Sequence, residues 1–462
     1  MDADLRETAM ARALALSEAQ EWDQLRAHVA DWSAPDLADL IEEAREVDPV
    51  SLLRALPPGI APAVFARLDH SHQERIVDDL SDDETRRILS DLPPDERTGV
   101  LAQLPADAAR RILALLSPED RKEASELLAY APESVGRLMT PDYVALRPDW
   151  TLAQALAFVR RHGNDSETIS RVYVVDAQGR LLDDLRLRQI ILGAPERMVS
   201  ALMDGDFEAL SPDDPRERAA HEMQRHDAFA LPVVDADGRM LGIVTADDAL
   251  QVAQEEATRD IQMMGGQEAL EAPYLETRFG TMMKKRGGWL ALLFLGEMLT
   301  ATAMAAFQDE IASAVVLALF IPLIISSGGN SGSQASTLVV RALALGQLRL
   351  RDWWRVIRRE IATGLALGGL LAAIGVLRIV VWHGAFGSYG AQYAPIAVVV
   401  GLSLVCVVAW GAISGSTLPF LLRRMGFDPA AASAPFVATL VDVSGLVIYF
   451  SIAKVVLSGH LV

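Results

Sequence analysis

Five long apolar segments in the C-terminal part of the chain constrain its fold more than any other feature. They cover residues 288–307, 311–338, 361–382, 394–422 and 430–457. Each is long enough to cross about 30 Å of hydrocarbon as a helix. Because backbone polar groups must be paired inside lipid, we expect an all-α transmembrane domain of five helices per subunit over residues 287–462.

The distribution of charge separates a soluble part of the chain from this membrane part. Residues 1–275 carry 54 acidic and 28 basic groups, whereas residues 276–462 carry 8 and 14. The chain begins with an acidic stretch and lacks the apolar core of a signal segment. We therefore expect the acidic part to stay in the cytosol.

Basic residues in the connections between the apolar segments predict the orientation of the protein. Lys284, Lys285 and Arg286 precede the first segment, six arginines lie within residues 341–359, and two lie at residues 423–424. By the positive-inside rule these three regions face the cytosol. We expect a multi-pass protein of the plasma (inner) membrane with a cytoplasmic N-terminus and the C-terminus outside.

The last apolar segment contains one acidic residue, Asp442. A charge at membrane depth costs roughly 2.5–3.5 kcal/mol on insertion scales, so a functional benefit is expected. Steps of three or four residues place it on one helix face with the following residues: Pro435, Thr439, Gly445 and Tyr449. A stripe of one carboxylate and small neighbours is typical of a cation path rather than of a lipid-facing surface.

The second apolar segment is rich in glycine and polar side chains. Pro322 predicts a break in the helix ladder that would turn free carbonyl oxygens toward a hydrated ion. Gly328 and Gly329 permit close approach of a neighbouring helix, so tight packing and pore lining are both compatible with these glycines. Asn330 and Gln334 favour lining, because buried amides need polar partners.

Two further charges lie inside the apolar segments. Arg378 is close to the outer end of the third segment, where snorkelling accounts for it. Glu297 in the first segment is either a second group for a cation or a partner of another helix, and the second role is the commoner one in helix bundles.

A twelve-residue period organises the first part of the chain. Leucines recur at positions 56, 68, 80, 92, 104, 116 and 128, and helix-start residues such as Ser, Asp and Pro follow them. Short helices of about eight residues must stack on their neighbours to bury an apolar face. We expect an all-α superhelical domain over residues 1–130. Its acidic turn residues are by default solvated caps, and only their density suggests a cation surface.

Residues 131–245 contain two copies of a mixed strand and helix unit, about sixty residues apart. They resemble the CBS pair, an α/β regulatory module that often binds adenine nucleotides such as ATP. In the second copy, Thr245 and Asp248 match the ribose and phosphate signature of that module, whereas the first copy has Gln189 where an acid is usual. Residues 246–286 then form an acidic connecting (plug) helix and a linker. The carboxylates of this helix either respond to divalent cations or form a solvated face.

Taken together, these motifs resemble the MgtE-type magnesium channels over nearly the whole chain. The resemblance implies a multidomain homodimer with a pore on its two-fold axis, in which Asp442 binds hydrated Mg2+. It also implies pore-lining roles for Gly328, Asn330 and Gly445, alongside Thr439 of the polar stripe.

The same resemblance implies that cytosolic Mg2+ closes the pore by drawing the cytosolic parts together. It assigns this sensing role to Glu217, Asp227, Asp248, Glu256, Asp260 and, at the membrane entrance, Asp428. The chain has Gln251 and Arg259 at connecting-helix positions where acids are usual. Closure by Mg2+ is therefore expected to be weaker here or to need a higher concentration.

Other functional classes compete with a channel. An ion-coupled secondary transporter of divalent cations is disfavoured because no inverted repeat is evident and few intramembrane groups are ionisable. A non-conducting sensor of nucleotide or Mg2+ is a further alternative. An enzyme is not expected, because no nucleophile set, P-loop or paired metal ligands occur in the sequence. We expect membrane lipid, and no nucleic acid, as a partner.

Overall fold

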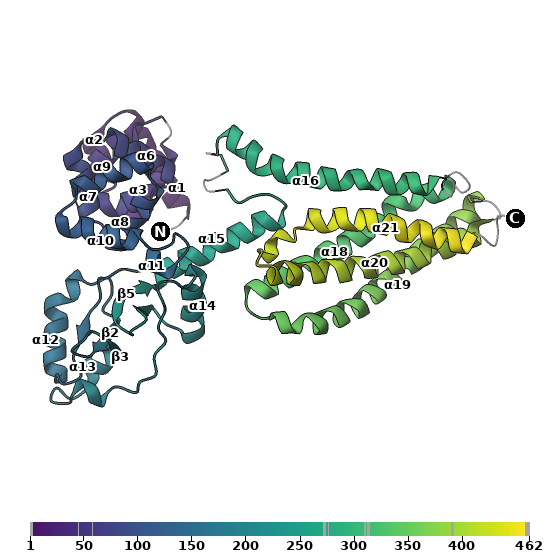
Figure 1. Ribbon diagram of the computed structural model, residues 1–462. Helices are drawn as coiled ribbons and strands as arrows, with labels where there is room; N and C mark the ends of the chain where they lie inside the picture. The colour runs from purple at the N-terminus through teal and green to yellow at the C-terminus, as the bar shows by residue number, and fades with distance from the viewer. Residues whose placement is uncertain are drawn as a thin grey trace. The chain divides into compact units, whose positions relative to one another are not determined.

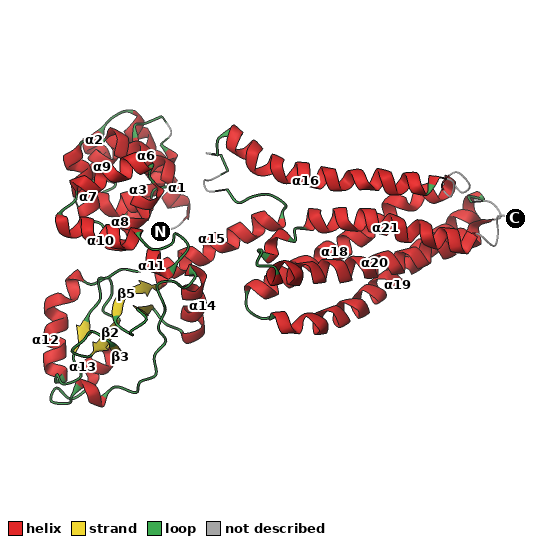
Figure 2. Cartoon of the chain, viewed as in Figure 1, coloured by secondary structure: helices red, strands yellow, loops and turns green. Residues whose placement is uncertain are grey.

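The computed structural model describes residues 3–44, 46–57, 59–270, 274–275, 277–308, 311, 315–389 and 392–457. The chain divides into two compact units, Met1–Glu256 and Ala257–Val462. Helices make up most of both units, and the strands of the described residues lie in the first unit (Figures 1 and 2).

Ten helices form the N-terminal part of the first unit. They are α1 (Ala3–Glu18), α2 (Trp22–His28), α3 (Ala34–Glu43), α4 (Pro49–Ala55), α5 (Ala61–Arg67), α6 (His70–Asp79), α7 (Asp82–Ser90), α8 (Pro94–Gln103), α9 (Ala106–Leu115) and α10 (Pro118–Leu128). The repeating leucines end these helices: Leu56, Leu68 and Leu104 are buried C-terminal caps of α4, α5 and α8. Each twelve-residue repeat thus consists of one short helix, the buried leucine that ends it, and the N-cap residue of the next helix.

The mixed part of the first unit contains two small sheets. Strand β1 (Ala145–Leu146) lies parallel to β2 (Arg171–Val175), which pairs antiparallel with β3 (Leu181–Arg186). Strands β4 (Ala230–Val234) and β5 (Met240–Thr245) form the second, antiparallel pair. The helices of this region are α11 (Val135–Leu138), α12 (Leu152–His162), α13 (Leu187–Leu192) and α14 (Arg216–His226). The two copies of the predicted repeat therefore each contribute one antiparallel strand pair.

Helix α15 (Ala246–Met264) follows β5 directly and ends at the predicted Gly265-Gly266 pair. Gly266 has a φ of +74°, a left-handed conformation that favours glycine. A Cβ atom at Gly266 would lie 3.0 Å from Pro435 and 3.0 Å from the indole nitrogen of Trp289. The chain after α15 therefore packs against the beginnings of two membrane helices of its own unit.

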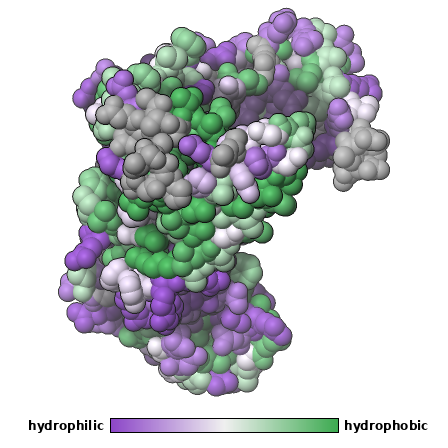
Figure 3. Space-filling view, turned by 90° about the vertical axis from the view of Figure 1, so that its right-hand side faces the viewer, coloured by the Kyte–Doolittle hydropathy of each residue, from purple (hydrophilic) through white to green (hydrophobic). Residues whose placement is uncertain are grey.

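The second unit contains five helices that are long and apolar enough, among the described residues, to cross a membrane. They are α16 (Phe279–Ala306), α18 (Ile321–Ala344) with the preceding 3-10 turn η3 (Val315–Phe320), α19 (Trp353–Phe386) with η4 (Leu350–Asp352), α20 (Tyr393–Arg424) and α21 (Ala434–Leu457) with the preceding turn η6 (Pro429–Ala431). Apolar side chains such as Phe294, Leu370 and Val455 are more than half exposed on them. Figure 3 shows a broad hydrophobic surface of the kind that lipid or another apolar partner would cover.

The predicted break at Pro322 is wrong. Helix α18 begins at Ile321, and Pro322 lies in its first turn, where the missing N–H costs no hydrogen bond. The glycine-rich stretch that follows is continuous α-helix. Carbonyl oxygens freed by this proline therefore do not line a path inside α18.

The glycines of α18 allow its backbone to touch that of α20. A Cβ atom at Gly411 would lie 2.2 Å from the carbonyl oxygen of Gly328, and one at Gly415 would lie 2.1 Å from that of Gly332. Such contacts exclude any side chain larger than hydrogen. Of the two roles that the sequence left open for these glycines, packing within the subunit is the one that the structure shows.

Replacing Gly415 by alanine should therefore force α18 and α20 apart. Overpacking of this kind costs about 1–3 kcal/mol, so the unfolding temperature of the purified protein in detergent should fall clearly. Gly369→Ala in α19 is the matched control, because a Cβ atom at Gly369 would meet nothing within 4 Å. An equal response of both variants would contradict the packing account.

Candidate cation sites

The predicted intramembrane carboxylate, Asp442, is half-buried in α21 and lies close to the carboxyl group of Glu297 on α16. The two helices meet through a small residue, because a Cβ atom at Gly296 would lie 3.0 Å from the methyl group of Thr439. Two carboxyl groups thus face each other between two apolar helices. The partner that the sequence analysis expected for Glu297 is Asp442 itself.

The residues of the polar stripe predicted on α21 differ in how deeply the structure buries them. Thr439 is half-buried, and its hydroxyl donates to the carbonyl oxygen of Pro435 at 3.1 Å. Gly445 is buried against Ile325 and Val407, and Tyr449 is buried with its hydroxyl donating to Leu317 at 2.8 Å. Only the half of the stripe that contains Thr439 and Asp442 is therefore accessible from outside the subunit.

The two residues of α18 that were predicted to line a pore, Gly328 and Asn330, also differ in burial. Asn330 is exposed on the surface of the subunit. Gly328 is buried, with Val407 and Val441 closest to where its Cβ atom would be. Gly328 and Gly445 therefore contribute to packing between the membrane helices, whereas Asn330 is exposed and Thr439 is half-buried with its methyl group near Gly296.

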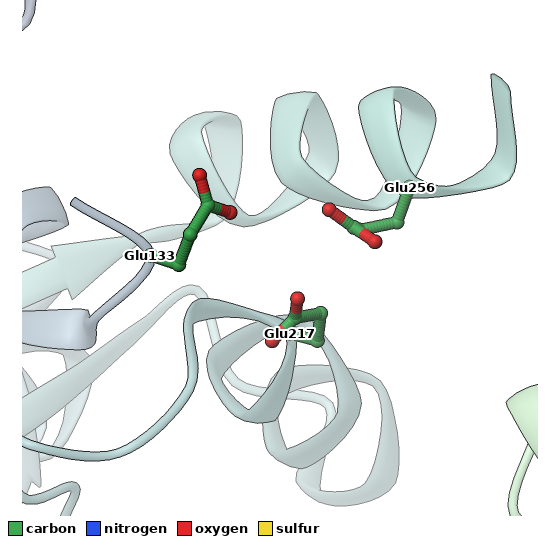
Figure 4. A group of neighbouring side chains, drawn as sticks. All are labelled: Glu133, Glu217 and Glu256. Atoms are coloured by element: carbon green, nitrogen blue, oxygen red, sulfur yellow. The ribbon is translucent and has the colours of Figure 1, made fainter. Parts of the chain in front are cut away.

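In the first unit, Glu217 and Glu256 converge with a third carboxylate. Figure 4 shows Glu133 on the segment before α11, Glu217 on α14 and Glu256 on α15 pointing toward a common space. One oxygen of each carboxylate lies within 4.8 Å of the others, which is close enough for a shared metal ion. We call these three residues the glutamate triad. The sequence analysis had selected two of them and missed Glu133.

A cation of the protein itself, Arg216, already contacts the glutamate triad. Its guanidinium group is 3.0 Å from Glu133, 3.0 Å from Glu255 and 3.1 Å from Glu256. Burial acts to lower the pKa of Arg216, but the carboxylates of Glu133, Glu256 and Glu255 outweigh it and raise that pKa. Arg216 therefore joins α14, α15 and the segment before α11 by charge. The sequence analysis did not single out this residue.

A second group of carboxylates lies where α8 meets the mixed part of the first unit. We call it the acidic interface, and it consists of Asp95, Glu96, Glu167, Asp247 and Asp248. Burial, with the neighbouring carboxylates adding to it, raises the pKa of Asp248 to about 7. For the same reasons the pKa of Asp95 lies well above its usual range. Carboxylates whose pKa values are raised in this way bind cations or protons to relieve their repulsion.

Asp95 is the clearest residue that the sequence analysis missed in this interface. One carboxylate oxygen of Asp95 is buried and, among the described residues, has no hydrogen-bond partner. The sequence predicts a solvated helix cap at this acid by default, because it follows two prolines at the start of α8, and only the density of such acids suggests a cation surface. Caps and interface acids have the same local sequence, so only the tertiary structure separates them.

The remaining predicted sensing residues lie apart from these two groups or outside their unit. Asp227 is exposed and ends α14 in a left-handed conformation, with a φ of +47°. Asp428 is exposed and caps η6 by accepting from the N–H of Ala430 at 2.8 Å. Asp260 lies on α15 within the second unit.

The predicted nucleotide residues contact each other. The hydroxyl of Thr245 donates to the carboxylate of Asp248 at 2.9 Å, and Thr245 is buried. Asp248 thus belongs both to the ribose and phosphate signature and to the acidic interface. A nucleotide and a cation would compete for the same carboxylate.

Comparisons with known proteins match most of the chain. Residues 321–452 match a family model described as a divalent cation transporter, residues 32–133 match the MgtE intracellular N domain, and residues 135–192 and 199–255 match the CBS domain. A magnesium transporter MgtE from Thermus thermophilus is 40% identical over 344 residues, which cover 74% of each chain. The chain belongs to the MgtE family of magnesium transporters.

Two further matches are also to MgtE proteins. A magnesium transporter MgtE from Enterococcus faecalis is 32% identical over 337 residues, which cover 73% of this chain and 72% of that one. A solved structure, the cytosolic domain of the Mg2+ channel MgtE in complex with ATP, is 36% identical, covers 52% of this chain and 99% of that one, and has a TM-score of 0.49.

Membership of the MgtE family confirms several predictions. The predicted fold class, with a helical N domain, a CBS pair and five apolar helices, is confirmed. The named relatives are transporters, in agreement with the expectation that the chain is not an enzyme. The chain is a multi-pass membrane protein of this family.

The raised pKa of Asp248 predicts how the stability of the first unit depends on pH. An acid whose pKa is raised on folding binds its proton more tightly when folded, so stability falls as pH rises toward and through about 7. With divalent cations chelated, the full-length protein should unfold at a higher temperature at pH 6 than at pH 8. Asp248→Asn should stabilise it at pH 8, by about 1.4 kcal/mol for each pKa unit removed.

The same substitution at the exposed neighbour, Asp247→Asn, is the control and should change the pH dependence less. A pH dependence that survives Asp248→Asn unchanged would contradict this account.

The contacts of Arg216 predict that part of the first unit holds together without metal. In Arg216→Gln the glutamate triad loses its cation, so α15 should open more readily when divalent cations are chelated. We expect hydrogen exchange within residues 246–256 to become about tenfold faster, corresponding to about 1.4 kcal/mol. Added Mg2+ should restore much of the protection.

Arg218→Gln is the matched control for this measurement. The partners of Arg218 are Asp214 and Glu208, neither of which lies on α15. Equal exchange in α15 for the two variants would show that Arg216 does not hold this helix.

Proposed function

We propose that the chain conducts Mg2+ through the membrane as a homodimeric channel, in which Asp442 contacts the hydrated ion. The observation that carries the proposal is a carboxylate held half-buried within an apolar span of an MgtE family member. Relatives named magnesium transporters support the choice of Mg2+ among divalent cations.

The chemistry of Mg2+ fits this arrangement. The ion gives up its waters reluctantly and usually keeps several of them while one or two carboxylates contact it. Asp442 and its symmetry mate in a dimer would supply two carboxylates. Asn330, which is exposed, and Thr439, which is half-buried, would accept or donate hydrogen bonds to the remaining waters.

Cytosolic Mg2+ would close the channel by filling the carboxylate groups of the first unit. The acidic interface joins α8 to the first turn of α15, and the glutamate triad joins α14 to α15. A divalent cation in either group would offset repulsion and draw these elements together. Glu217, Glu256 and Asp248 are the predicted sensors that belong to these groups. Asp227, Asp260 and Asp428 would act as separate contacts.

The proposal includes a division of labour along the chain. Residues 1–130 and the CBS pair over 131–245 would sense cytosolic cations, and residues 246–286 would transmit closure to the pore over 287–462. The contact of Gly266 with Trp289 and Pro435 supports transmission at that point. The proposed orientation places the sensing part in the cytoplasm and the C-terminus outside the inner membrane, as the basic connections predict.

A nucleotide-sensing role is the second candidate function. It is favoured by Thr245 and Asp248, which contact each other at the position of the CBS signature. ATP would bind there as an additional ligand that competes with the cation for Asp248. A sensor without transport predicts ATP binding and no flux, whereas a coupled transporter predicts flux that requires a gradient of H+ or Na+.

Flux through liposomes tests the proposal directly. With the purified protein reconstituted and an entrapped Mg2+ indicator, we expect Asp442→Asn to reduce Mg2+ entry by at least tenfold, and Asp442→Glu to retain part of it. A membrane potential alone should drive entry, with no coupling ion. Undiminished flux in Asp442→Asn would refute the proposed role of this carboxylate.

A further inference from the structure

Glu297 of α16 is the one other acidic residue that the described structure brings against Asp442. Their carboxyl groups lie close enough to interact electrostatically. The neighbouring side chains Leu295, Met298 and Leu299 are more than half exposed, whereas Glu297 is half-buried. α16 therefore turns its carboxylate toward α21 and its apolar side chains outward.

Helix packing supports this placement independently of the carboxyl contact. Gly296 brings α16 close to Thr439, which lies three residues before Asp442 on the same helix face. On α16, Thr300 lies one turn beyond Glu297, and its hydroxyl is buried without a hydrogen-bond partner among the described residues. The contact between the two helices thus contains polar groups that helix packing alone does not use.

We propose that Glu297 is a second carboxylate that the transported cation meets, and that it determines selectivity for divalent over monovalent cations. This inference rests on the proposed role of Asp442. Two ionised carboxylates in contact repel strongly where water is scarce. A divalent cation offsets both charges, whereas a monovalent cation leaves one of them uncompensated.

The pair formed by Asp442 and Glu297 also changes how many carboxylate ligands one subunit offers to the cation. With Glu297, a single subunit presents two carboxylates at the same level, so the symmetry mate of Asp442 is not needed to reach the one or two that Mg2+ usually contacts. A dimer would then present four. Such a path should hold the dication more tightly than one with Asp442 alone.

The test uses the full-length protein in liposomes and compares Glu297→Gln with the unchanged chain. Glutamine keeps the size of the side chain and can donate a hydrogen bond to Asp442, so it removes the charge and preserves the contact. We expect the half-saturating Mg2+ concentration to rise about tenfold. Excess Na+ should also inhibit Mg2+ entry more strongly in the variant than in the unchanged chain.

Two further variants make the outcome decisive. Glu297→Asp keeps the charge and should retain selectivity, so an equal defect in Glu297→Asp and Glu297→Gln would show a role of shape and overturn the proposal. Glu360→Gln is the matched control, because Glu360 lies on α19, which packs against α20. Its half-saturating concentration should be unchanged.

The result for Asp442 separates this inference from the proposed function. If Asp442→Asn abolishes flux while Glu297→Gln matches the unchanged chain in affinity and in sensitivity to Na+, the inference about Glu297 is wrong and the channel proposal stands. If Asp442→Asn conducts normally, the channel proposal itself fails.

Discussion

Carboxylates held together where water is scarce are the constraint on which this structure depends. Repulsion between such groups is relieved only by a proton, a metal ion or a positive side chain. The protein shows the last solution where Arg216 contacts the glutamate triad, and again where the buried Arg97 contacts Asp120 and Glu123. At the acidic interface Arg67 offsets part of the charge of Glu96, but the charges that act most strongly on Asp95, Asp248 and Asp442 among the described residues are all negative. These two places are therefore where a mobile cation would have the largest effect.

The membrane helices differ in how firmly the subunit holds them. In the apolar window of α20, 67% of the residues are buried, whereas none are buried in that of α16. The glycine contacts between α18 and α20 account for the tight centre. α16 instead meets α21 around Gly296, beside the two carboxyl groups. The most loosely packed helix thus carries one of the two groups that would contact an ion.

Local patterns predicted much of the fold, and tertiary contacts determined the rest. Segment length indicated five spans, and the leucine period indicated short stacked helices, because both patterns are properties of neighbouring residues. Glu217 and Glu256 were predicted from the sequence, but Glu133 joins them from another segment, and the contacts of Arg216, the neighbour of Glu217 on α14, with Glu133 and Glu256 leave no local signal. At Pro322 the local pattern was ambiguous, because a proline within an apolar run fits either a break in a helix or the first turn of one. In α18 it lies in the first turn.

The central claim is that the carboxylate of Asp442 meets the transported ion. The most direct measurement is the position of Mn2+, used as a visible substitute for Mg2+, in an experimental structure of the full-length protein in lipid. The account predicts bound metal density at Asp442, at about 2 Å for direct coordination or about 4 Å through one water. Metal found only in the first unit, with Asp442 facing acyl chains, would contradict it.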